Sequence, residues 1–251
     1  MKSALNTTIS AAWETLGADD PLWAILTRKD KRGNRWSVDE FFATGELDVR
    51  RLLDHRRACQ ITPPFRNVLD FGCGVGRLAR VWAQHADSVT GVDVSSTMLD
   101  KGRDYNKDIP NLHFVHNTST DLKVLGDRQY DLIFSYICLQ HIPWPIASYI
   151  REFGRVCAPG GHVIFQLPTQ PPPRAWIGIW RKKIIEGLPF GLGKLYRRMR
   201  GRSNASFDVF FIPTDDVLLV AQDAGLKLVR VFRDHSTGGN ALGLIYLFSK
   251  Y

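Results

Sequence analysis

The chain has 251 residues, 44% of them hydrophobic, which suits one α/β core with added segments rather than two separate cores. Its formal net charge is +8, and its four cysteines lack the paired spacing of a zinc site or a disulfide framework, so reduced thiols and no metal are expected. The absence of a signal-like N-terminus and of any apolar run of transmembrane length argues against a secreted or membrane-spanning protein and predicts a cytoplasmic one.

Residues 1–60 are expected to form a helical cover ahead of the sheet. Apolar spacing predicts four helices in this part of the chain: Ala11–Gly17, Pro21–Leu26, Val38–Phe42 and Asp48–His55. Thr44-Gly45 is interpreted as a break between the last two. The aromatic residues before this break, Trp36, Phe41 and Phe42, either fold over the mouth of a ligand site or pack the helices on the sheet, and the residues alone leave both roles open.

The most informative stretch is Asn67–Arg80, which predicts a strand, a tight glycine-rich turn and a helix. Gly72, Gly74 and Gly76 let the backbone turn sharply and leave room for a ligand to lie against it. Their G-x-G-x-G spacing differs from the G-x-G-x-x-G fingerprint of dinucleotide pyrophosphate sites. The turn therefore predicts a shelf for a nucleotide-sized ligand and weakens the case for NAD.

Two carboxylates indicate what this ligand carries. Asp70 lies at the turn, where its charge disfavours a pyrophosphate and favours an ammonium group such as that of S-adenosylmethionine. Asp93 follows the apolar run Val89–Val92, and a carboxylate at the tip of a neighbouring strand accepts hydrogen bonds from both hydroxyls of a ribose. The segment behind it, Asp93–Ser96, offers the N-cap of the next helix.

The motifs L-D-F-G-C-G-V-G, G-V-D-V-S, Y-D-L-I-F-S and A-P-G-G-H, in this order, resemble those of the class I S-adenosylmethionine-dependent methyltransferases. The resemblance spans roughly residues 67–167, with a looser similarity to the C-terminus. It implies an α/β fold, a seven-stranded Rossmann-like and mostly parallel sheet with helices on both faces and an antiparallel last strand. It also implies S-adenosylmethionine as the cofactor, while it says little about the methyl acceptor.

The same resemblance implies which residues contact the cofactor. Asn117 and Thr118, after the third predicted strand Leu112–His116, are expected at the adenine edge, with Asp121 as the acidic alternative. Met98 lies either against the adenine or in the ordinary core. The predicted cofactor site comprises Phe42, Asp70, Gly72, Cys73, Gly74, Arg77, Asp93, Val94, Met98, Asn117, Thr118 and Tyr136.

His141 is the candidate catalytic residue. It follows the fourth predicted strand, Tyr130–Tyr136, at the carboxyl end where open α/β sheets place their ligands. A histidine that titrates near neutral pH suits removal of the proton from a hydroxyl acceptor. The corresponding residue is structural in other members of the family, so both roles are open. Ser135–Cys138 departs from the D/N/S-P-P-Y/F/W motif of base methyltransferases, and no specific nucleic-acid partner is expected.

The remaining segments complete the predicted single domain of residues 1–251, with a cofactor-binding core at 61–168, a lid insertion at 169–212 and a C-terminal part at 213–251. The lid mixes apolar residues with a basic run at 174–202, which suits an acceptor lid, peripheral contact with a membrane, a subunit interface or a plain cap on the sheet. The other expected elements are a helix at Ile146–Cys157, a strand at His162–Leu167, a helix with a Thr214 cap, and strands at Lys227–Phe232 and Leu242–Ser249.

These features favour O-methylation of a small molecule, such as a saccharide, a lipid-linked glycan or a secondary metabolite, by a monomer or homodimer. One alternative is N- or C-methylation, which does not require His141 as a base. Another is a non-catalytic cofactor-binding or scaffold protein that docks through its basic segment.

Overall fold

The computed structural model describes residues 2–57, 59, 61, 65–142, 146–170, 209–236 and 241–251. Nearly all of the predicted lid at 169–212, including the basic run at 174–202, lies outside the described residues. Within the described part of the chain, no helix combines the length and the apolar character that crossing a membrane requires.

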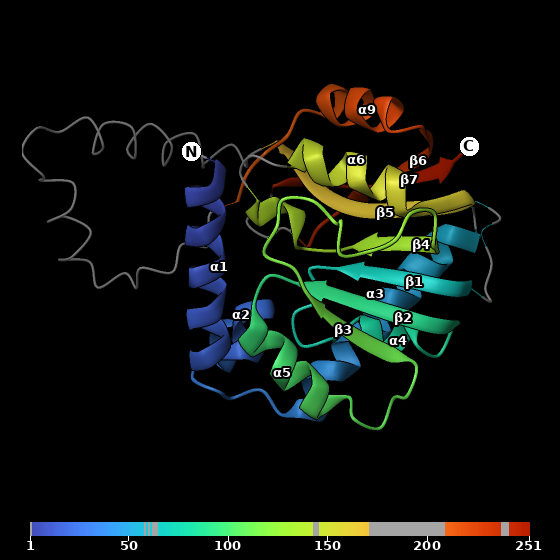
Figure 1. The fold of residues 1–251 in the computed structure, drawn as a ribbon. Helices are drawn as coiled ribbons and strands as arrows, with labels where there is room; N and C mark the ends of the chain where they lie inside the picture. The colour runs from blue at the N-terminus through green and yellow to red at the C-terminus, as the bar shows by residue number, and fades with distance from the viewer. Residues whose placement is uncertain are drawn as a thin grey trace, which may run out of the picture.

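One mixed sheet organises the fold, and its seven strands lie in the order β3-β2-β1-β4-β5-β7-β6 (Figure 1). Of the strands in the described residues, β7 is the one that runs antiparallel, and it pairs in this way with β5 and β6. Strands β1 to β5 pair with one another in parallel. This confirms the predicted mostly parallel sheet with an antiparallel last strand. The strands are β1 Phe65–Phe71, β2 Ala86–Asp93, β3 Leu112–His116, β4 Tyr130–Ser135, β5 Cys157–Gln170, β6 Leu226–Asp234 and β7 Leu242–Lys250.

Helices cover both faces of the sheet (Figure 1). The α-helices are α1 Lys2–Asp19, α2 Pro21–Ile25, α3 Val38–Arg57, α4 Ala79–Trp82, α5 Ser96–Tyr105, α6 Ile146–Val156 and α9 Thr214–Asp223, and the 3-10 helices are η1 Lys29–Lys31 and η2 Leu139–His141. Side chains alternate along each central strand, so both faces are apolar. Val68 and Leu132 pack toward α3 and α4, whereas Leu69 and Ile133 pack toward α6 and α9.

The predicted break at Thr44-Gly45 is wrong, because α3 runs without interruption from Val38 to Arg57. Gly45 allows the backbone of α3 to approach the backbone of Arg77 closely and does not form a turn. A Cβ on Gly45 would lie 2.5 Å from the backbone oxygen of Arg77, so the missing side chain lets α3 rest directly on the glycine-rich turn. Thr44 stays helical and its hydroxyl donates to the carbonyl oxygen of Phe41 at 2.6 Å.

Strand β5 is longer than predicted at both ends. Ala158–Gly161, the segment between the predicted helix and the predicted strand, lies inside it, where the pairing with β4 shifts register and Gly160 has a φ of +74°. Pro168 does not end the strand, because the register with β7 shifts just beyond it and its carbonyl oxygen accepts the N–H of Ile212 at 3.0 Å. Thr214 is not an N-cap: Pro213 takes that position, and the Thr214 hydroxyl lies 3.1 Å from that of Tyr246.

Candidate functional site

A cavity lies at the carboxyl ends of β1, β2 and β4. Helix α1 runs along this edge of the sheet in Figure 1 and contributes lining residues. The position of the cavity agrees with the edge of an open α/β sheet where ligands bind. Ten of the predicted cofactor residues contribute to its lining, as does His141: Asp70, Gly72, Cys73, Gly74, Arg77, Asp93, Val94, Met98, Asn117 and Tyr136. Residues that the sequence did not indicate complete it: Ile9, Trp13, Ala24, Ile25, Phe71, Leu78, Val92, Ile137, Cys138, Ile142 and Tyr149.

Two predicted cofactor residues, among those the structure describes, do not line the cavity: Phe42 and Thr118. Phe42 is 8% exposed, and its ring meets those of Phe41 and Tyr105 edge to face at centroid distances of 5.5 and 6.0 Å. These contacts hold the Phe42 ring in the apolar cluster of the N-terminal helices, and the alternative acidic residue Asp121 is not a lining residue either.

The glycine-rich turn forms the floor of the cavity. Gly72 and Gly74 have φ angles of +76° and +54°, which side-chain-bearing residues rarely adopt. A Cβ on Gly72 would lie 2.0 Å from the Sγ of Cys138, so the turn and the segment after β4 touch through the space that a side chain would fill. The missing side chains therefore let both the β4 segment and a ligand lie directly against the turn.

Asp70 and Arg77 both line this cavity, and each has an unused hydrogen-bonding atom. Asp70 Oδ2 and Arg77 Nε are buried and have no hydrogen-bond partner among the described residues. Burial raises the pKa of Asp70 to about 7, the neighbouring Arg77 works against this rise, and Asp93 adds to it. Arg77 is anchored by Asp48 at 2.7 Å and Thr44 at 3.0 Å. A buried carboxyl group and a buried guanidinium with spare atoms fit the ammonium and carboxylate of the amino-acid end of S-adenosylmethionine.

Asp93 connects the two segments that follow β1 and β2. Its Oδ2 accepts the N–H of Gly74 at 2.8 Å and its Oδ1 accepts the N–H of Ser95 at 3.0 Å. Burial raises its pKa, although these N–H bonds act in the opposite direction. Each carboxylate oxygen has two lone pairs, so both oxygens can also accept a hydroxyl of a ribose.

The segment after β4 carries strained backbone. Ile137 lines the cavity with a φ of +57°, an unusual conformation for a β-branched residue. Before it, the hydroxyl of Tyr136 donates to the buried Asp234 at 3.1 Å. After it, Cys138 packs on Gly72, and burial raises the pKa of its thiol. Strain of this kind persists where surrounding contacts fix it, and such contacts flank Ile137 on both sides.

His141 ends η2 and faces the cavity. The side-chain amide of Gln140 lies 3.2 Å from its Nε2 and, as a donor, requires a lone pair on that nitrogen and a proton on Nδ1. Gln140 is oriented in turn by the amide of Gln166 at 3.4 Å. The ring of Trp13 meets the imidazole edge-on, with centroids 5.7 Å apart. The imidazole thus has a basic nitrogen and an aromatic neighbour.

Helix α1 forms a wall of the cavity because Glu14 fastens it to α5. The Glu14 carboxylate accepts the N–H groups of Ser96 at 2.6 Å and Thr97 at 3.1 Å, at the N-terminus of α5. Although burial acts in the opposite direction, these bonds lower the pKa of Glu14 to about 2. The neighbouring Trp13 is thereby held over the cavity, and no local sequence pattern indicated either residue.

Replacing Glu14 by alanine is expected to lower the free energy of unfolding by about 1 kcal/mol at pH 7, the usual value of a helix cap. Because the folded-state pKa lies below its ordinary value of 4.5, this contribution is complete above about pH 4.5 and is lost as the pH falls toward 2. Urea unfolding of the wild type and the variant from pH 7 to pH 3 measures the difference. A difference that stays constant with pH would exclude this role for the carboxylate, and Glu14→Gln should retain part of the cap.

Comparison with known proteins identifies methyltransferases as relatives of this chain. A family model described as "Methyltransferase domain" matches residues 68–161. The ubiquinone biosynthesis O-methyltransferase of Alkalilimnicola ehrlichii is 31% identical over 169 residues, 66% of this chain and 68% of that protein. The protein of the same name from Vibrio vulnificus is 34% identical over 101 residues, which span 40% of this chain and 43% of that protein. For that relative, the chain therefore matches less than half of the length.

Solved structures share the fold over nearly the whole chain. The magnesium protoporphyrin IX methyltransferase of Synechocystis, solved with S-adenosylhomocysteine, has a TM-score of 0.66 at 18% identity and covers 98% of this chain and 99% of its own. The N-methyltransferase NodS of Bradyrhizobium japonicum, also solved with S-adenosylhomocysteine, has a TM-score of 0.60 at 15% identity and covers 96% and 98%. At these identities the likeness concerns the fold.

Proposed function

Because the chain belongs to the class I S-adenosylmethionine-dependent methyltransferases, we propose that it methylates a hydroxyl group of a small molecule with an apolar body. The O-methyltransferase name of its relatives supports the oxygen acceptor. The observation that carries the proposal is His141, a histidine with a basic nitrogen at the cavity that also contains Asp70 and Asp93.

The lining of the cavity supports an apolar acceptor. The lining includes Trp13, Ile25, Ile137, Ile142 and Tyr149, which offer flat and aliphatic surfaces, and the Trp13 ring lies against His141 itself. Such surfaces favour a secondary metabolite with an aromatic or aliphatic body over a saccharide, whose many hydroxyls require polar partners.

Each group of the site has a role in this reaction. Bound S-adenosylmethionine supplies an electrophilic methyl group. Asp70 and Arg77 bind the amino-acid end, and Asp93 binds the ribose, which fixes the cofactor against the glycine-rich turn. His141 accepts the proton of the acceptor hydroxyl at Nε2, where the hydroxyl replaces the amide of Gln140.

Replacing His141 by alanine is expected to lower kcat/KM for a hydroxylated acceptor by about 10²- to 10⁴-fold, because general-base catalysis contributes that much. The affinity for S-adenosylhomocysteine should change little. The measurement is methyl transfer to a panel of hydroxylated aromatic compounds, with wild-type rates rising as the histidine deprotonates. His113→Ala, an exposed histidine on β3, is the matched control. Full turnover of the same hydroxylated acceptors by the His141 variant from pH 6 to pH 9 would exclude His141 as the base.

A further inference from the structure

Three side chains along helix α6 contact the loop between β3 and β4. Tyr149, Glu152 and Arg155 are three residues apart, so they lie on one side of the helix. The hydroxyl of Tyr149 donates to the carbonyl oxygen of Ser119 at 2.9 Å. Tyr149 also lines the cavity, so the row begins at the site and extends away from it.

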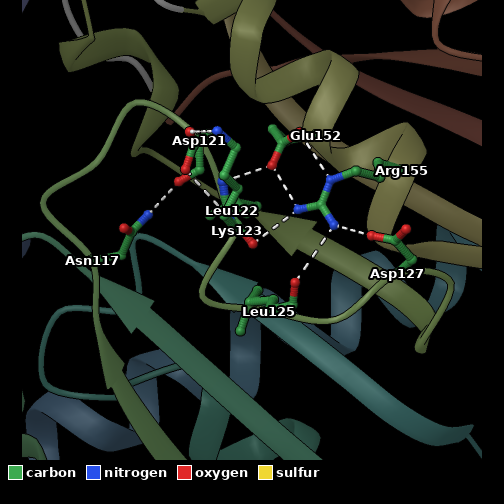
Figure 2. A network of polar contacts seen from close by, with 8 residues as sticks. All are labelled: Asn117, Asp121, Leu122, Lys123, Leu125, Asp127, Glu152 and Arg155. Atoms are coloured by element: carbon green, nitrogen blue, oxygen red, sulfur yellow. Dashed lines mark hydrogen bonds and ion pairs between the residues drawn. The ribbon is translucent and has the colours of Figure 1, made fainter.

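Glu152 and Arg155 fix the middle of this loop, as Figure 2 shows. Glu152 Oε2 accepts the N–H of Leu122 at 2.7 Å, and Arg155 donates to the carbonyl oxygen of Leu122 at 2.9 Å. The two side chains also pair with each other at 2.7 Å, and Arg155 reaches the carbonyl oxygen of Leu125 at 3.5 Å and the carboxylate of Asp127. Both backbone groups of Leu122 are thus bound by α6.

The same loop determines the orientation of the Asn117 amide. Asn117 Nδ2 donates to the carbonyl oxygen of Asp121 at 2.7 Å, and its Oδ1 accepts the N–H of Ser119 at 3.1 Å (Figure 2 shows the first of these bonds). A flipped amide would set donor against donor and acceptor against acceptor, so the two contacts allow one orientation. The amide of Asn117 thus binds the loop at Ser119 and Asp121, and α6 binds the loop at Ser119 and at Leu122, the residue after Asp121.

Asn117 lies at the end of the cavity where the nucleobase belongs. The sheet order puts β3 beside β2, and the N–H of Asn117 donates to the carbonyl oxygen of Asp93 at 3.0 Å. A ligand with its ribose at Asp93 and its ammonium at Asp70, on β1, extends its base toward β3. Asn117 Oδ1 has a second lone pair, which suits a base that carries an exocyclic amino donor.

We propose that Tyr149, Glu152 and Arg155 are positioning residues that hold Asn117 as a hydrogen-bond acceptor and so make the site select an adenine over a 6-oxo purine. This inference rests on the proposed function, because it requires an adenosyl cofactor in the cavity. A 6-oxo base presents an acceptor where adenine presents its amino group, so it faces the Asn117 oxygen without a hydrogen bond.

The test is calorimetric titration of the full chain with S-adenosylhomocysteine and with S-inosylhomocysteine, which has an oxo group in place of the amino group at position 6 of the purine and a proton on N1. Because the change at N1 is the same for every variant, the effect of each substitution on the preference reports the contact at position 6. The wild type is expected to prefer the adenosyl compound at least about tenfold. Glu152→Ala should reduce this preference several-fold, and Glu152→Gln should restore part of it because its carbonyl still accepts the Leu122 N–H. Arg151→Ala, an exposed residue on the same helix, should leave the preference unchanged.

The preference for the adenosyl over the inosyl compound distinguishes a positioning role of these residues from a general effect on the stability of the fold. If Glu152→Ala weakens both compounds equally, the row supports the fold alone and the inference is wrong. If Glu152→Ala does not fold, Tyr149→Phe tests the inference instead. It removes only the Tyr149 hydroxyl that donates to the carbonyl oxygen of Ser119, and it should also reduce the preference for the adenosyl compound. Wild-type protein that binds both compounds equally would overturn the inference and leave the proposed function standing. Wild-type protein that binds neither would overturn both.

Discussion

Replacing Asp93 by alanine is expected to raise the Kd for S-adenosylhomocysteine about a hundredfold or more. In the proposed site the carboxylate accepts two ribose hydroxyls, and hydrogen bonds to a charged group contribute about 1.5–3 kcal/mol each. The loss of its bonds to the N–H groups of Gly74 and Ser95 should add to the effect, because these bonds shape the turn and the start of α5. Calorimetric titration measures the Kd.

Asp131 offers a matched control for Asp93. Its Oδ2 accepts two backbone N–H groups, those of Arg66 at 2.6 Å and Asn67 at 3.0 Å, at the amino-terminal ends of β1 and β4. Asp131→Ala should therefore lower stability in a similar way and leave the Kd unchanged. Equal losses of affinity in the two variants would show that Asp93 acts through the fold, and an unchanged Kd in Asp93→Ala would refute the ribose contact.

Replacing Gly72 by alanine is expected to lower the free energy of unfolding by about 3 kcal/mol or more and to abolish cofactor binding. The new Cβ would lie 2.0 Å from Cys138 Sγ and 2.5 Å from Cys138 Cβ, so the backbone of one segment must move. The φ of +76° adds a conformational cost of about 1–2 kcal/mol. Urea unfolding and titration with S-adenosylhomocysteine measure the two effects.

Gly33→Ala measures the conformational cost of a side chain at a positive φ without the steric cost that Gly72→Ala adds. It has a φ of +82°, and a Cβ there would have no neighbour within 4 Å, so Gly33→Ala should cost about 1–2 kcal/mol and leave cofactor binding intact. Adding Cys138→Gly to Gly72→Ala removes both clashing atoms and should recover part of the lost stability. Equal costs for Gly72→Ala and Gly33→Ala would rule out the contact with Cys138.

The sequence predicted the parts of the site that are encoded locally. The glycine-rich turn, Asp70 and Asp93 follow apolar strand patterns within a few residues, and the parallel sheet brings their strand ends to one edge. An N-cap within Asp93–Ser96 was predicted for the same reason and is confirmed: the structure places it at Ser95, whose hydroxyl accepts the N–H of Met98 at 3.2 Å.

The parts that were not predicted depend on contacts between distant segments. Glu14 and Ser96 are 82 positions apart, and nothing near Glu14 indicates that α1 lies on α5. Ile137 has a φ of +57°, and both of its neighbours contact distant segments, Tyr136 through Asp234 and Cys138 through Gly72, which residue type does not reveal. Phe42 was expected at the cofactor because aromatic residues suit either a site or a core, and its contacts with Phe41 and Tyr105 favour the core.

The arrangement of polar groups along the cavity has a consequence for turnover. In the proposed assignment Asn117, Asp93, Asp70 and Arg77 bind the base, the ribose and the two ends of the amino acid. All of these ligand groups are unchanged after the methyl group has left. S-Adenosylhomocysteine therefore retains the same contacts, loses only the sulfonium charge, and competes with the next molecule of cofactor. The rate of methyl transfer then depends on the ratio of S-adenosylmethionine to S-adenosylhomocysteine around the protein. A separate enzyme that degrades S-adenosylhomocysteine would therefore raise this rate.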